Sequence, residues 1–233
     1  PWLRSILQLL LYRITTLKQC LQSEEISGTT LYRSDYFSLA TPNLRSSFTY
    51  FFENEKWNNI LCGRILNLID NNKIPINFIE DEDGKYSYQT LKSQTLNNNQ
   101  SFKKNIKDYI LRGYKKIAEK LVKDKDAFLI NTYLNSKQLF KLELNLGQFP
   151  QFWKKIETSI NAKPNQSLRE SLTKKFLKKS EDDLENILRN LLFELLPVCY
   201  LEGFQELTKI ANQQPWPKSP KFIFTCNQFG TDE

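Results

Sequence analysis

The sequence predicts a helix-rich α/β protein. Two long segments in its first third carry apolar residues at helical spacing. In its centre a helical segment, a short apolar run and a second helical segment follow one another, which is the order of a parallel α/β sheet. A hydrophobic content of 40% and a charged content of 25% are those of a soluble globular protein. The 233 residues suffice for one large domain, or for one domain and part of another.

The first predicted element is a helix over residues 1–22. Pro1 is tolerated in a first helical turn. Apolar residues recur at intervals of three and four, and we expect this stripe to pack in the core rather than against a partner. The stripe comprises Leu3, Leu7, Leu10, Ile14, Leu17 and Leu21.

A second helix is predicted over residues 45–70, after a break at Pro42. Core packing explains its aromatic residues better than base stacking, because no glycine-rich RNA-binding strand accompanies them. Its face comprises Trp57, Leu61, Ile65 and Leu68, and its aromatic cluster Phe48, Phe51 and Phe52. Residues 73–92 then predict a surface hairpin with its turn at Asp83 and Gly84.

The helical period returns from Ser101, with one face formed by Phe102, Ile106, Tyr109, Ile110, Ile117 and Leu121. The run 126–136 predicts a buried strand, and Ser136 a helix N-cap after it. Ligands of parallel α/β folds bind beyond the carboxyl ends of the strands. Tyr133 and Asn135 are therefore candidate binding residues.

Several helix signals follow. Residues 167–170 match a capping box, Ser180 begins another helix, and Pro197 should divide it. Three prolines over residues 215–220 predict a stiff connector, and residues 221–225 a strand. Thr231 or Asp232 would then cap a helix that the chain does not contain. Because the chain also begins at Pro1 and has no Met, we expect an internal segment of a longer protein.

Charge and residue types narrow the function classes. The net charge of +7 is compatible with an anionic partner, but acids are interspersed among the lysines, which is typical of solvated helix faces. Without histidine the segment has no Ser-His or Cys-His pair, and we infer no metal from this segment. The four cysteines form no C-x-x-C pair, so we expect reduced, mostly buried thiols. No apolar run approaches the roughly 20 residues of a membrane span.

Two stretches carry a family resemblance: residues 1–19 and residues 196–233. The second holds Tyr-Leu-Glu-Gly at 200–203, Trp-Pro at 216–217, and Phe-Thr-Cys-Asn at 224–227. In these motifs the chain resembles the transferases encoded in bacterial O-antigen and surface-carbohydrate biosynthesis loci. Cys226 stands where serine is commoner in that family. The stretch 147–153 matches more weakly.

The resemblance implies a glycosyltransferase-like enzyme of two facing Rossmann-like domains, the GT-B arrangement. Residues 1–214 would be the rear part of a helix-rich N-terminal domain. Residues 215–233 would be the connector and first strand of a truncated C-terminal domain. The resemblance implies a cytoplasmic enzyme, open to peripheral contact with the inner membrane, and we expect this segment alone to be inactive.

The same resemblance implies the substrates: a nucleotide-activated sugar and a carbohydrate or lipid-linked acceptor, with no further cofactor in this segment. Thr225 and Asn227 could bind sugar or phosphate, or could simply shape a turn. Tyr200 and Glu202 would face the interdomain cleft. Glu202 is the candidate base for an acceptor hydroxyl, against the alternative of a solvated surface acid.

Two other function classes stay open. A non-enzymatic helical module could bind nucleic acid or an anionic membrane through a basic face, with an affinity that falls steeply with salt. A structural scaffold in a carbohydrate-synthesis complex would bind neither donor nor polyanion. The interspersed acids argue against nucleic acid as the partner.

Overall fold

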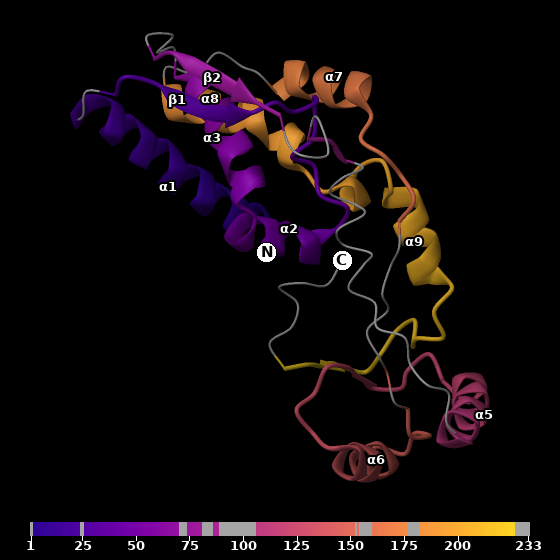
Figure 1. The fold of residues 1–233 in the computed structure, drawn as a ribbon. Coiled ribbons are helices and arrows are strands. Elements are labelled where there is room, and N and C mark those ends of the chain that lie inside the picture. Colours follow the sequence, from indigo (N-terminus) through magenta and orange to yellow (C-terminus); the bar gives the residue numbers. More distant parts are fainter. Residues whose placement is uncertain are drawn as a thin grey trace. The chain divides into compact units, whose positions relative to one another are not determined.

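The computed structural model describes residues 2–23, 26–69, 74–80, 86–88, 106–151, 153, 160–176 and 182–226. The chain divides into two compact units. Unit 1 comprises Pro1–Asn98, Ile160–Gln205 and Thr231–Glu233, and unit 2 comprises Asn99–Ser159 and Glu206–Gly230. Each holds helices and a small parallel sheet, which confirms the helix-rich α/β prediction (Figure 1). The domain boundary predicted between residues 214 and 215 stays a prediction.

Unit 1 is built around one large hydrophobic core, and a smaller buried cluster holds Ala40, Tyr88 and Val198. Its helices are α1 (Trp2–Ser23), α2 (Leu44–Glu53), α3 (Glu55–Leu68), α7 (Gln166–Phe176) and α8 (Asp183–Leu195). Helix α1 contacts both α3 and α8. The core side chains come from α1, α2, α3 and α8 and from the segment between β1 and α2, with Trp57, Phe51 and Leu61 among the largest.

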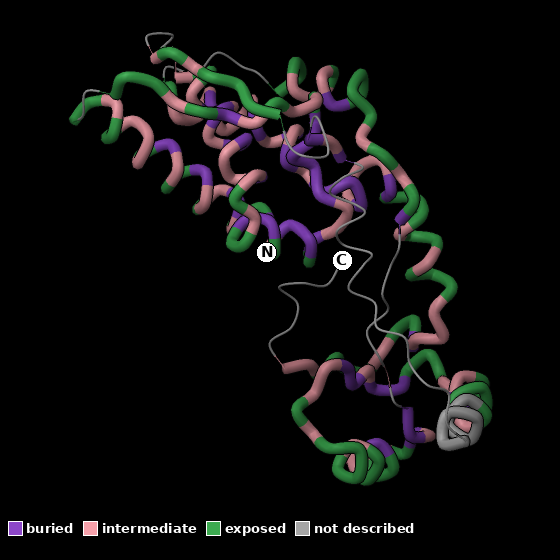
Figure 2. Tube along the Cα trace, in the orientation of Figure 1, coloured by how far each residue is buried: buried purple, intermediate pink, exposed green. Residues whose placement is uncertain are grey.

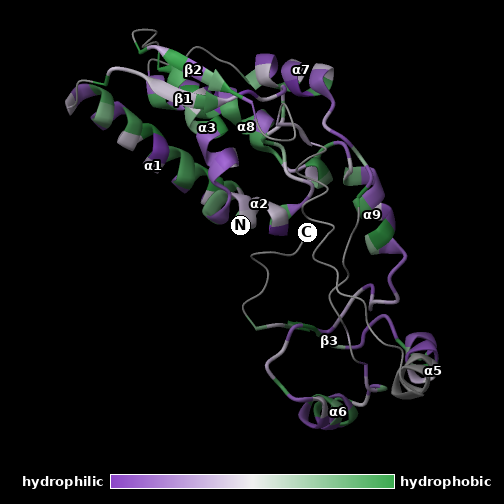
Figure 3. Cartoon of the chain, in the orientation of Figure 1, coloured by the Kyte–Doolittle hydropathy of each residue, from purple (hydrophilic) through white to green (hydrophobic). Residues whose placement is uncertain are grey.

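The helix predicted at the N-terminus is present, and its predicted stripe is buried at Leu10 and Ile14 but not at Leu3. Trp2, Ile6, Leu10 and Ile14 enter the core, and Leu3 is half exposed. Buried and exposed residues alternate along α1 (Figure 2). Two apolar stripes lie on this helix, and Figure 3 shows hydrophobic residues recurring along its length. Helical period alone could not choose between them.

The second predicted helix is divided at Asn54. Its side chain accepts a hydrogen bond from the Trp57 backbone N–H at 2.8 Å and so caps the start of α3. Its backbone N–H donates to the Tyr50 carbonyl and so closes the end of α2. Trp57 lies fully in the core, and its Nε1 donates to the Leu39 carbonyl at 3.1 Å. Phe51 is buried as predicted, but Phe52 and Leu68 are exposed.

The predicted hairpin is wrong about the partner of its first strand. Strand β2 (Ile76–Ile79) pairs in parallel with β1 (Thr29–Tyr32), a strand that the sequence analysis did not predict. Tyr86 bridges Ser34, again in parallel. The expected turn at residues 83 and 84 lies outside the described residues. Partners 47 residues apart leave no local signal comparable to a hairpin turn.

Unit 2 has the predicted order of helix, strand and helix: α5 (Ile106–Lys120), β3 (Phe128–Leu129) and α6 (Ser136–Asn145). The strand predicted at residues 221–225 is β4 (Ile223–Phe224), and it pairs with β3 in parallel. The predicted face of α5 is wrong at Ile117 and Leu121, which are exposed, whereas Ala118 is buried.

Three predicted caps are revised. Asn135, not Ser136, caps α6, because its side chain and that of Gln138 form a reciprocal capping box. Asn165 rather than Ser167 caps α7, since its Oδ1 accepts from the Leu168 N–H at 3.1 Å. Helix α8 is capped by Asp182. The predicted caps Ser180, Thr231 and Asp232 lie outside the described residues.

Pro197 divides the helical stretch as predicted. Helix α8 ends at Leu195, a 3-10 turn spans Val198–Tyr200, and α9 (Phe204–Asn212) follows. The thiol prediction was only partly right: all four cysteines are free, but Cys20 is exposed and Cys199 alone is fully buried. Among the described residues, no helix has the length and apolar character needed to cross a membrane.

We expect Gly203→Ala to destabilise unit 1 by about 1 to 3 kcal/mol. A Cβ at this position would lie 2.3 Å from Ile160 Cγ2 and 3.3 Å from both the Cys199 Cα and the Val198 carbonyl oxygen. The measurement is urea unfolding monitored by hydrogen exchange of the backbone amides of α8. Gly113→Ala on α5 of unit 2 is the control, because nothing lies within 4 Å of its added Cβ, and its effect is read from the α5 amides. Equal stability of the two variants would contradict the expected crowding.

Candidate functional site

The carboxyl ends of β3 and β4 lie at one edge of the unit 2 sheet. Leu129 pairs with Phe224, and the parallel direction brings the segments after both strands together. The Ile130 N–H donates to the Phe224 carbonyl at 3.0 Å, and the Cys226 N–H to the Asn131 carbonyl at 3.3 Å. We call residues 130–135 and 225–226 the β3–β4 edge.

Three of the predicted binding residues, Tyr133, Asn135 and Thr225, belong to the segments that follow the two strands. Tyr133 is 78% exposed, and Thr225 is half-buried directly after β4. Asn131 has a φ of 51°, in the left-handed region that asparagine tolerates better than most residues, and so turns the chain as soon as it leaves β3. Asn135 closes the edge, but its side chain is committed to the α6 cap. Asn227 lies outside the described residues.

The N-terminus of α6 follows the β3–β4 edge. Its first turn carries no acid and contains Lys137. Backbone N–H groups at such a terminus favour an anion. Asn135 Oδ1 already accepts from the Gln138 N–H at 3.0 Å, so a ligand would meet the earlier N–H groups of the turn.

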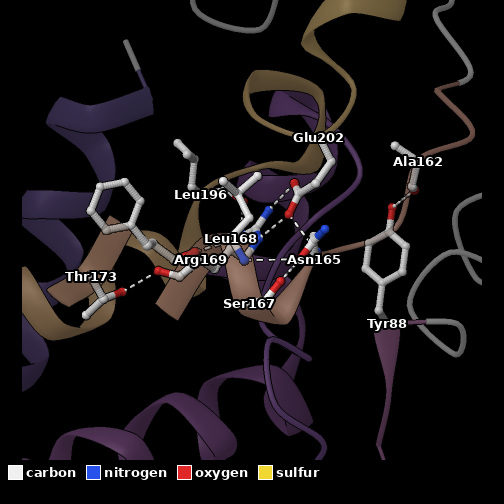
Figure 4. Close-up of polar contacts among 10 residues, drawn as sticks. Tyr88, Ala162, Asn165, Ser167, Leu168, Arg169, Thr173, Leu196 and Glu202 are labelled. Carbon is white, nitrogen blue, oxygen red and sulfur yellow. Dashed lines mark hydrogen bonds and ion pairs between the residues drawn. The ribbon is translucent and has the colours of Figure 1, made fainter. Parts of the chain in front are cut away.

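The remaining predicted site residues, Tyr200 and Glu202, belong to unit 1. Tyr200 is half-buried and packs against the hydrophobic core. Glu202 forms a bidentate ion pair with Arg169: Nε lies 2.6 Å from Oε1 and Nη2 lies 2.7 Å from Oε2 (Figure 4). The side chains are 0% exposed for Arg169 and 7% for Glu202, so Glu202 is not a solvated surface acid.

Arg169 also satisfies the end of α8. Its Nη1 donates to the Phe193 carbonyl at 2.7 Å and to the Leu196 carbonyl at 2.9 Å. The last carbonyls of a helix have no partner within the helix, and Pro197 prevents α8 from continuing. Arg169 therefore supplies the donors that a further helical turn would have supplied.

Glu202 in turn supports the start of α7. Its Oε1 accepts from the Asn165 backbone N–H at 2.8 Å. In a capping box a glutamate in the helix itself reaches back to this N–H, but Leu168 occupies that position. Glu202 performs this task from 37 residues away. The ion pair thus holds α7, α8 and the 3-10 turn in one arrangement, a structural role that the sequence analysis missed.

Tyr88 lies beside this pair, and its hydroxyl donates to the Ala162 carbonyl at 3.3 Å (Figure 4). Burial raises the pKa of Tyr88 to about 12, against the positive charge of Arg169. The hydroxyl is therefore neutral at physiological pH and acts as a hydrogen-bond donor.

Unit 2 holds a second buried carboxyl, Glu143 on α6. Its Oε2 accepts from the Gln151 backbone N–H, and its Oε1 is buried with no partner among the described residues. Burial raises the pKa of Glu143 to about 7, and the charge of Asp126 adds to the shift. The Gln148 side chain fixes the residue that precedes β3. Its Oε1 accepts from the Ala127 N–H at 2.7 Å, and its Nε2 donates to the Ala127 carbonyl at 3.0 Å.

The family model of the LIC12162 family transferase matches residues 1–233. The chain belongs to this family. Membership of the LIC12162 family identifies it as a transferase sequence, which confirms the predicted class of enzyme at this level. No curated protein and no solved structure matches it.

For a LIC12162 family transferase the two candidate regions differ in character. The β3–β4 edge carries polar side chains after two parallel strands, of which Tyr133 and Asn135 are exposed and Thr225 is half-buried. The Arg169–Glu202 pair is buried and fully engaged within unit 1. The β3–β4 edge is therefore the better candidate for substrate contact. The predicted role of Glu202 as a base stays a prediction.

Proposed function

We propose that this LIC12162 family transferase moves a sugar from a nucleotide-activated donor to a carbohydrate or lipid-linked acceptor during synthesis of a bacterial surface polysaccharide such as O-antigen. The observation that supports it is the β3–β4 edge, where two parallel strands end together, with exposed Tyr133 and Asn135 after one strand and half-buried Thr225 after the other. Such an edge is where α/β folds bind nucleotides.

Each part of the edge has a task in this proposal. The donor diphosphate lies at the N-terminus of α6, whose first turn carries no acid. The exposed ring of Tyr133 offers a face on which a base or sugar stacks. The Thr225 hydroxyl donates a hydrogen bond to a sugar or phosphate oxygen.

The reaction is a substitution at the anomeric carbon of the donor. The acceptor oxygen forms a bond to this carbon while the bond to the diphosphate oxygen breaks. The nucleoside diphosphate leaves with the electron pair, and a base takes the proton of the acceptor hydroxyl. Positioning of donor and acceptor supplies a large share of the catalysis.

Calorimetry of the protein, expressed from its complete reading frame, against a panel of nucleotide sugars tests this proposal. We expect one class of donor to bind, and we expect Tyr133→Ala to weaken binding about tenfold, since one stacked ring contributes about 1 to 3 kcal/mol. Thr225→Val should weaken it as well, by loss of one hydrogen bond. Tyr36→Ala is the matched control, because Tyr36 in unit 1 is 76% exposed.

Two outcomes would count against the proposal. One is a folded protein that binds no nucleotide sugar. The other is binding that Tyr133→Ala and Thr225→Val leave unchanged, which would move the donor site away from the β3–β4 edge. Affinity for nucleic acid that falls steeply with salt would instead support the alternative of a helical binding module.

A further inference from the structure

Helix α5 carries an apolar stripe whose described side chains are exposed. Ile117 is 59% exposed, and Leu121, directly after the helix, is 45% exposed. Successive helical residues are about 100° apart, so these two residues, four positions apart, lie on one side of α5. The same period places positions 106 and 110, both isoleucine, on that side. At Gly113 an added Cβ would meet nothing within 4 Å, so the surface is open there as well.

The side of α5 that packs within unit 2 is a different one. Ala118 is buried. Tyr114 stacks on Phe149 with the ring centroids 5.7 Å apart, and its hydroxyl donates to the Pro150 carbonyl at 2.8 Å. Ile117 lies about 100° around the helix from Ala118. These contacts therefore hold α5 in unit 2 and leave the apolar stripe at the surface.

Positive charge borders this stripe. Lys116 and Lys120 are exposed, and the helical period places them beside the stripe, on its outer side. The helix contains two acids, at positions 108 and 119, and both lie on the side opposite the stripe. Glu119 is paired with Lys115. The surface formed by Ile117, Leu121, Lys116 and Lys120, which we call the outer face of α5, thus combines apolar side chains with uncancelled positive charge.

The positive charge of the chain is concentrated in the unit that contains α5. Unit 2 has 16 lysines and arginines against 7 aspartates and glutamates, a net charge of +9. Unit 1 has 17 against 19, a net charge of −2. Such an asymmetry points to an anionic partner. The apolar stripe favours a lipid surface over nucleic acid, because a phosphate backbone is bound through charge, whereas the membrane interface also takes up apolar side chains.

We propose that the outer face of α5 docks on the surface of an anionic lipid membrane. Ile117 and Leu121 enter the boundary between headgroups and acyl chains, and Lys116 and Lys120 attract the headgroups. A second copy of the chain fits this face less well, because two copies paired along it would bring four lysines together. With 15 residues α5 is about 22 Å long, shorter than the roughly 30 Å of the hydrocarbon core, so it lies along the membrane.

Flotation with lipid vesicles of the protein expressed from its complete reading frame tests this inference, which does not depend on the sugar-transfer proposal. We expect binding to vesicles of phosphatidylcholine with phosphatidylglycerol, weak binding to phosphatidylcholine alone, and a loss of binding at high salt. Ile117→Gln with Leu121→Gln should lower vesicle binding at least about tenfold, by removing apolar area that the membrane buries. Lys116→Gln with Lys120→Gln should lower it about thirtyfold, the equivalent of two basic residues near the surface.

Each double variant has a matched control in unit 1. Leu3→Gln with Leu11→Gln removes two leucines of α1 that are 50% and 47% exposed. Lys174→Gln with Lys175→Gln removes two exposed lysines from the last turn of α7, and so changes the net charge by the same amount. Both controls should leave vesicle binding nearly unchanged, because neither alters the outer face of α5.

Circular dichroism checks that the variants are folded, and none of the substituted residues is buried. Failure of the folded protein to bind anionic vesicles would overturn the inference, as would unchanged binding by the double variant of Ile117 and Leu121. Equal losses in the two lysine variants would also overturn it, because net charge rather than α5 would then account for binding. If the protein is a dimer that the double variant of Ile117 and Leu121 converts to a monomer, a second copy covers this face and the membrane is the wrong partner.

Discussion

Replacement of Glu202 by glutamine is expected to lower the free energy of unfolding of unit 1 by about 3 to 5 kcal/mol. The substitution keeps the shape of the side chain but leaves the Arg169 guanidinium, which is 0% exposed, without a counter-charge. A buried unpaired charge is among the costliest defects in a folded protein. Urea unfolding monitored by hydrogen exchange of α8 amides measures the loss in unit 1 alone.

The control is Glu185→Gln. Glu185 pairs with Arg189 on the surface of α8, where the two side chains are 43% and 33% exposed, and exposed pairs contribute little. If Glu202→Gln costs no more than Glu185→Gln, the Arg169–Glu202 pair is not buried in solution. Removal of both partners by Arg169→Met with Glu202→Leu should cost less than the two single losses added together, because it leaves no lone charge. It should still destabilise, since the Phe193 and Leu196 carbonyls lose their donors.

The second large effect is a dependence of unit 2 stability on pH. Glu143 has its pKa raised from 4.5 to about 7 in the folded chain. Below pH 4.5 the Glu143 carboxyl is protonated in both the folded and the unfolded chain. In this range Glu143 does not lower the free energy of unfolding of unit 2. Between pH 4.5 and 7 the unfolded chain is ionised while the folded chain keeps the proton, so the free energy of unfolding falls as pH rises. The total fall corresponds to about 3 kcal/mol.

Glu143→Gln should abolish most of this fall, because the amide stays neutral and its oxygen still accepts from the Gln151 N–H. The measurement is hydrogen exchange of residues 143–151 and 126–130 across this pH range. Glu119→Gln on α5 is the control, a half-buried acid paired with Lys115, and should keep the wild-type slope. If Glu143→Gln keeps the wild-type dependence on pH, another group causes it.

Local signals in the sequence located most helices and three of the four predicted strands, namely β2, β3 and β4. Ile223–Phe224 follows the proline connector, and α8 ends before Pro197, because proline and apolar period act over a few residues. The caps were displaced by one or two residues, since asparagine competes with serine for this position.

The candidate site was predictable in part. A strand between two helices places the following residues at the carboxyl edge of a sheet, which is how Tyr133 and Asn135 were found. That Thr225 joins them depends on β4 pairing with β3, between residues 95 apart. Arg169 was missed because its partners, Phe193, Leu196 and Glu202, lie 24 to 33 residues away.

The sequence by itself determined the α/β class, the division of the helices at Pro197, and the resemblance to a transferase family, because periodicity, proline geometry and motifs are properties of neighbouring residues. Only the tertiary structure decided which face of α1 is buried, that β2 pairs with β1, and that Glu202 is an ion-pair partner. These features depend on burial against segments that are distant in the sequence. The free energy of that burial comes from contacts among several elements, so it leaves no pattern in the sequence of any one element.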